Sequence, residues 1–138
     1  MQQIGSLDIN AMLRAAVVPL IWWIGMVVVV AVGGYPGVAC VTPLAWMLAC
    51  WTGNNCAARS RSPARQRLVE AAIAGAIVGF GQGVLFYVVL NVVMPLGADE
   101  RASAATISAL VLVVGMLAGA LLSMATAAMR NRRREAGG

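Results

Sequence analysis

Histidine is absent from all 138 residues of the chain. Because histidine is a common haem ligand, the commonest zinc ligand and the commonest general base, its absence disfavours haem sites, zinc sites and most acid–base catalysis. Lysine is absent as well, so all ten basic residues are arginine. Arginine without lysine, with much alanine, glycine and valine, is typical of proteins encoded by GC-rich bacterial genomes. We therefore expect a bacterial protein.

Charge of either sign is scarce: 11% of the residues are charged, whereas a soluble domain carries roughly a quarter. No ionisable residue is expected deep in a hydrophobic segment, and Glu70 is expected near a membrane interface. Proton-coupled transporters and voltage sensors normally keep such a group within the membrane. The sequence thus predicts no enzyme, no metal site and no cofactor. The basic isoelectric point does not indicate nucleic-acid binding, because the charges lie at segment ends.

The three cysteines, Cys40, Cys50 and Cys56, are spaced C-x9-C and C-x5-C. These spacings do not fit a metal site, and an odd number argues against a disulfide framework. We expect small apolar fillers. Thiol chemistry at Cys56, close to Arg59, is the one residue-level feature that could support an enzymatic activity.

Long hydrophobic runs dominate the chain, which is 61% hydrophobic. A spanning helix needs about 20 predominantly apolar residues. The runs predict an all-α integral membrane protein of one domain, residues 1–138, with four transmembrane helices in two antiparallel hairpins that form a compact bundle. The expected helices are residues 16–33, 37–58, 67–94 and 104–129. Cleavage of the first as a signal peptide is a minor alternative.

Local signals place two helix starts. Ser62 followed by Pro63 predicts an N-cap with proline at the first helical position. Asp99, Glu100 and Ser103 suit the start of the last helix, since acidic side chains favour the positive end of the helix dipole and serine can cap it.

The arginines lie on one side of the expected membrane. A basic linker (residues 59–67) and a basic tail (130–138) follow the second and fourth helices, and only Arg101 falls on the other side. Because arginine is retained in the cytoplasm, both termini are expected to face it across the inner membrane. The same side chains could contact anionic lipid headgroups. They are Arg59, Arg61, Arg65, Arg67, Arg130, Arg132, Arg133 and Arg134.

Small residues recur at intervals of four in three of the expected helices. Such stripes let helix backbones approach closely in lipid, where burial of apolar area gains nothing. They are Ala45, Ala49, Gly53 and Ala57; Ala71, Gly75, Gly79 and Gly83; and Gly115, Gly119, Ser123 and Ala127. We expect them to pack within the chain, with the alternative that one stripe faces another chain.

Gln82 lies near the middle of the third expected helix. An unpaired amide in hydrocarbon costs several kcal/mol, so a partner is required. An interhelical hydrogen bond and a ligand or pore contact are the two interpretations. Asn91 and Tyr87, with Thr42 and Ser108, lie nearer the outer boundary and could form a polar cluster. Asn91 and Tyr87 are, with Gln82, the candidate ligand or pore contacts.

Three functions fit this description. The first is a non-catalytic membrane subunit or assembly factor that packs against other membrane helices, in a hetero-complex or a homo-oligomer. The second is a homo-oligomeric channel or facilitator for a neutral or weakly ionic solute, with Gln82 facing the shared axis. The third is a holin-like pore former.

Overall fold

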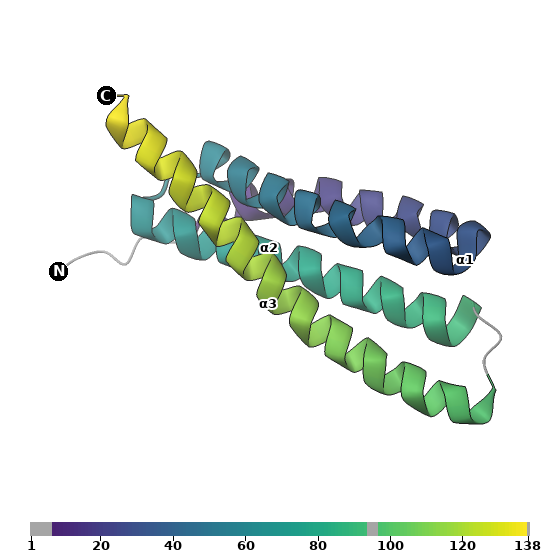
Figure 1. Cartoon of the computed structure of the whole chain (residues 1–138). Helices are drawn as coiled ribbons and strands as arrows, with labels where there is room; N and C mark the ends of the chain where they lie inside the picture. Colours follow the sequence, from purple (N-terminus) through teal and green to yellow (C-terminus); the bar gives the residue numbers. More distant parts are fainter. Residues whose placement is uncertain (1–6, 94–96, 138) are drawn as a thin grey trace.

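The computed structural model describes residues 7–93 and 97–137, without the side chains of 34–42, 93 and 98. Within these ranges the chain is entirely helical and contains no strand. Its elements are α1 (Ile9–Arg59), α2 (Ala64–Val88), the π-helix η1 (Val89–Val93), which continues α2, and α3 (Ala98–Ala136). Figure 1 shows them as a bundle that α3 crosses obliquely.

The helix α1 folds back on itself. Met12, near its start, and Cys56, near its end, belong to one buried cluster, whereas a straight helix rising about 1.5 Å per residue would separate them by about 66 Å. Figure 1 shows two arms side by side, the first purple and the second blue. We call Ile9–Gly33 the first arm and residues 43–59 the second arm. The helix α1 continues across residues 34–36, which separate the first two predicted helices, 16–33 and 37–58.

The start of α2 differs in detail from the prediction. Pro63 itself precedes the helix as its N-cap, without a side-chain cap. The Ser62 hydroxyl instead donates a hydrogen bond of 2.6 Å to Oε1 of Glu70. Ser62 therefore joins the linker to α2 through a side chain rather than through the helix terminus.

The helix α3 is longer than the predicted hydrophobic segment at both ends. It begins at Ala98, and the Glu100 carboxylate accepts a 2.9 Å hydrogen bond from the N–H of Gly97, the preceding cap residue. It ends at Ala136, so most of the basic tail is helical. Arg133 and Arg134 occupy its last turn, where cations interact favourably with the helix dipole.

Among the described residues, three helical stretches are long and apolar enough to cross a membrane: Ile9–Gly33, Ala64–Val92 and Asp99–Ala136. The distribution of side-chain size supports this reading. Ala15, Ala71 and Ala127 are fully buried, whereas Ile24 and Val32 are 65% and 85% exposed. A water-soluble core has large apolar residues inside, and the inverse arrangement suits lipid, where close approach of small residues holds helices together.

Candidate functional site: an apolar cavity between the helices

The small residues of the three stripes line the contacts between helices. All are buried except Gly115, which is half-buried. A Cβ atom on Gly79 would overlap the backbone carbonyl of Gly115, and one on Gly53 would overlap the backbone of Ser123. The Ser123 hydroxyl also donates a 2.7 Å hydrogen bond to the carbonyl of Ala49. The stripes of the second arm, α2 and α3 therefore face one another within the chain.

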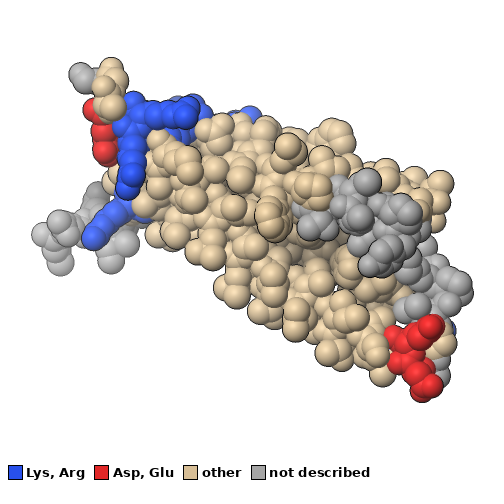
Figure 2. Space-filling model, in the orientation of Figure 1, with Lys and Arg blue, Asp and Glu red and all other residues tan. Residues whose placement is uncertain are grey.

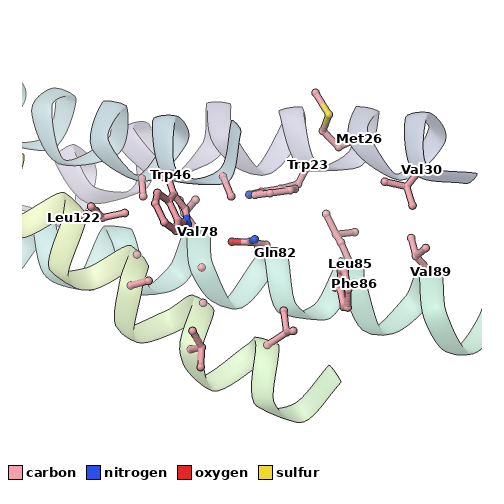
Figure 3. A pocket seen from close by; sticks show the side chains of 18 of the residues that line it. Trp23, Met26, Val30, Trp46, Val78, Gln82, Leu85, Phe86, Val89 and Leu122 are labelled. Atoms are coloured by element: carbon pink, nitrogen blue, oxygen red, sulfur yellow. The ribbon is translucent and has the colours of Figure 1, made fainter. Parts of the chain in front are cut away.

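A cavity of about 350 Å³ lies between both arms of α1, α2 and α3. Its walls are valine, leucine, alanine, glycine, methionine and aromatic side chains, with Gln82 as the one amide. Figure 3 shows Trp23 entering from the first arm and Gln82 from α2. The glycines of α2 and α3 help to form this space because they bring no side chain into it.

The cavity reaches the molecular surface between the second arm and α3. Trp46 and Leu110 line it, yet they are 60% and 64% exposed. Figure 1 shows α3 diverging from α1 toward the end at which α3 begins. In a bilayer this side of the cavity communicates with lipid rather than with water.

Trp23 and Gln82 bring into the cavity polar groups that have no hydrogen-bond partner among the described residues. Trp23 is 2% exposed, and its Nε1–H is buried. Gln82 is half-buried, and no hydrogen bond of its carboxamide is found among the described residues. Figure 3 shows both side chains directed into the space between α1 and α2. A buried donor without an acceptor costs about 1–3 kcal/mol, so the site favours an occupant that accepts a hydrogen bond from Trp23.

The side chains that line this cavity are suited to binding a ligand. None of the described side chains that line it titrates or acts as a nucleophile. The polar side-chain groups that line it are the indole N–H groups of Trp23 and Trp46 and the carboxamide of Gln82.

The outer polar residues do not join this site. The Asn91 Nδ2 donates to the carbonyl of Tyr87 at 2.9 Å and to the hydroxyl of Ser108 at 3.3 Å. The Tyr87 side chain is 49% exposed and does not line the cavity. The side chain of Thr42 lies outside the described residues. Asn91 and Ser108 thus form a small interhelical contact, separate from Gln82.

Glu70 was expected near a membrane interface, but its side chain is fully buried, with 0% exposed. Its Oε1 accepts hydrogen bonds from the Asp8 N–H at 2.7 Å and from the Ser62 hydroxyl at 2.6 Å, and its Oε2 has no partner. It therefore connects α2 to the start of α1 and to the linker. The sequence contained no signal for this, because the fold brings together residues 62 positions apart.

The described cysteine side chains and the linker arginines lie outside the cavity. Cys56 is fully buried in an alanine-rich cluster with Ala57 and Ala71, and Cys50 is half-buried. The side chain of Cys40 is outside the described residues. Of the linker arginines, Arg67 is half-buried, and the others are exposed: Arg59, Arg61 and Arg65.

Trp23 was not singled out by the sequence analysis, although a signal existed. Ala16, Trp23 and Val30 recur at seven-residue spacing on the first arm, and all three are buried. Such spacing places residues on one helix face. The neighbouring Trp22 points elsewhere and is 55% exposed.

No protein-family model matches the chain, and no match was found among curated proteins or solved structures.

Proposed function

We propose that this chain is a non-catalytic membrane protein that binds a small, neutral, mainly apolar molecule carrying a carbonyl or hydroxyl oxygen. The observation that carries the proposal is the buried, unpartnered Trp23 N–H in a mainly apolar cavity. The oxygen of the ligand would accept from Trp23, and a hydroxyl could also donate to the Gln82 carbonyl. A charged ligand is disfavoured, because an unpaired charge in such a site costs far more than a polar group.

The dimensions of the cavity agree with a small ligand. Its volume of about 350 Å³ lies near the lower end of the roughly 300–1,000 Å³ typical of ligand sites. The opening beside Trp46 and Leu110 would admit the ligand from lipid. Facilitated movement of a neutral solute is then possible for a single chain, with Gln82 beside an internal cavity rather than on a shared axis.

The proposed topology has four spans, with the second arm of α1 as the fourth, and both termini in the cytoplasm of a bacterium. Figure 2 shows arginine side chains gathered at the end where α3 terminates, with acidic atoms beside them, and acidic side chains at the end where α3 begins; the surface between the two ends is uncharged. Asp99 and Glu100 form the first turn of α3, and Arg133 and Arg134 its last. The positive-inside rule supports this orientation.

Association with other membrane helices is the second part of the proposal. Because the small-residue stripes face one another inside the chain, a partner would contact large outward side chains such as Trp46 and Met47, which are 60% and 68% exposed. This contact would make the chain a subunit or assembly factor in addition to a binding protein.

Native mass spectrometry of the intact assembly, extracted in a mild detergent, tests both parts. An organic extract of the same sample, analysed by mass spectrometry, should contain a neutral oxygen-bearing molecule in fixed ratio to the chain, and Gln82→Leu should reduce that ratio. Asn91→Leu is the matched control, because Asn91 lies outside the cavity. If the two variants retain the same small molecules as the native chain, the cavity is not the binding site. A protein partner at fixed stoichiometry would instead support the subunit role.

A further inference from the structure

A second hollow lies at the basic end of the molecule, between the second arm and α3. It is a groove of about 620 Å³. Its lining combines arginine, uncharged polar and apolar side chains: Cys50, Trp51, Asn54, Thr126, Met129, Arg130, Arg133 and Arg134. None of these residues lines the central cavity, so the groove is a separate site.

Two of the arginines are held in place across the groove. Arg130 Nη1 donates a 2.7 Å hydrogen bond to Oδ1 of Asn54, and Arg134 Nη2 donates to the carbonyl of Ala58 at 3.3 Å. Arginine side chains lose conformational freedom when they bind. Because these two are already tethered to the second arm, less freedom remains to be lost when a ligand arrives.

The positive charge of the groove is uncompensated. No carboxylate lines it among the described residues, and the Nε of Arg130 is buried without an acceptor. The guanidinium group of Arg133 donates no hydrogen bond within the described chain, and the residue is exposed. Planar guanidinium groups with free N–H donors are suited to phosphate oxygens, which they can bind in pairs.

The remaining wall of the groove is apolar. Trp51 is 37% exposed and Met129 is 59% exposed, and both lie beside the arginines. A ligand that fits this lining has an anionic group at one end and a hydrocarbon chain at the other. A soluble anion would leave the apolar wall uncovered.

We propose that this groove binds the headgroup of an anionic phospholipid, with the phosphate on Arg130, Arg133 and Arg134 and an acyl chain along Trp51 and Met129. The position of the groove, where the hydrophobic segment of α3 gives way to its arginine-rich end, suits a lipid of the same leaflet. The site is built from two helices, whereas simple anchoring by basic residues needs no groove. Arg132, which does not line the groove, serves anchoring alone.

The test uses the full-length protein in a neutral detergent. Native mass spectrometry measures the binding of phosphatidylglycerol and of phosphatidylcholine with identical acyl chains. One triple variant removes the groove charges: Arg130→Gln, Arg133→Gln and Arg134→Gln. A second triple variant removes the same amount of charge outside the groove: Arg61→Gln, Arg65→Gln and Arg132→Gln.

We expect the native protein to bind phosphatidylglycerol at least about tenfold more tightly than phosphatidylcholine, since each arginine near an anionic lipid contributes about fivefold. The groove variant should lose this preference, and the outer variant should keep it. If the groove variant does not fold, Arg133→Gln alone is informative, because the Arg133 side chain makes no hydrogen bond within the described chain. This single substitution should weaken the binding of phosphatidylglycerol several-fold.

Three results would overturn the proposal. The first is an equal loss of the phosphatidylglycerol preference in both triple variants, which would mean that general charge attraction causes the preference. The second is equal binding of the two lipids to the native protein. The third is displacement of phosphatidylglycerol by an equal concentration of inorganic phosphate, which would mean a site for free anions.

Discussion

The hydroxyl of Ser123 on α3 donates a 2.7 Å hydrogen bond to the carbonyl of Ala49 on the second arm, across 74 positions of sequence. Both residues are buried, and both belong to small-residue stripes. Such a bond is possible because Gly53, where a Cβ would overlap the backbone of Ser123, lets the two helix backbones come close. Close packing and interhelical hydrogen bonding therefore occur in the same contact.

Ser123→Ala should destabilise the protein by roughly 0.6–1 kcal/mol, the usual range for an interhelical hydrogen bond in a membrane protein. Unfolding in mixed micelles of SDS and a mild detergent measures this free energy. Thr106→Ala is the control, because the Thr106 hydroxyl bonds within its own helix, to the carbonyl of Ala102 at 3.2 Å. An equal effect of the two substitutions would show that the Ser123–Ala49 bond contributes nothing.

Gly79→Ala should destabilise the contact between α2 and α3. The added Cβ would overlap the backbone carbonyl of Gly115, and because backbone cannot rotate away, the helices must separate. We expect a loss of at least about 1–3 kcal/mol, the range for overpacked cores. Gly25→Ala is the matched control, since nothing lies within 4 Å of a Cβ atom added at position 25. That control should be neutral or slightly stabilising because alanine favours helix; similar losses in both variants would contradict the close contact.

Glu70→Leu should loosen the start of α1, because it removes the acceptor for the Asp8 N–H and the Ser62 hydroxyl. Each buried donor left without an acceptor costs about 1–3 kcal/mol. Hydrogen exchange of the amide of Asp8 should become faster. Glu70→Gln keeps one carbonyl oxygen at this position and should change the exchange far less. Unchanged exchange in Glu70→Leu would show that this hydrogen bond does not hold the N-terminal segment.

The proposed orientation predicts labelling of single cysteines placed in a cysteine-free background. Asp99→Cys, at the start of α3, should react in intact cells with a membrane-impermeant maleimide. Arg61→Cys, in the basic linker, should react only after the cells are lysed. Both positions are exposed, so burial does not limit either reaction. The reverse pattern would place the termini on the other side of the membrane.

The sequence was sufficient to predict the all-helical class and long apolar helices, because composition and segment length determine both. The four-residue spacing identified which small residues share a helix face, but not which faces meet, since that depends on how the helices are arranged. Burial of Glu70 was not predictable, because its partner Asp8 is brought to it only by the fold.

In the candidate site, too, the sequence does not determine which side chains face the cavity. Trp22 and Trp23 are equivalent in composition and hydropathy, yet one is 55% exposed and the other 2%. A rotation of about 100° per residue separates them, and only the helix packing decides which enters the cavity. Gln82 was identified because an amide in a hydrophobic helix is chemically unusual, whereas a tryptophan there is not.

The adjacent tryptophans provide the most direct test of ligand binding. In lipid nanodiscs, the affinities of n-octanol and n-octane are compared by their effects on thermal unfolding. The two molecules are similar in size, but only octanol has an oxygen that can accept from the Trp23 N–H. Octanol should bind the native protein about fivefold more tightly, which corresponds to one hydrogen bond of about 1 kcal/mol. Trp23→Phe should reduce this difference, and Trp22→Phe should leave it intact. Equal binding of the two molecules to the native protein, or the same result in both variants, would contradict a polar binding site at Trp23.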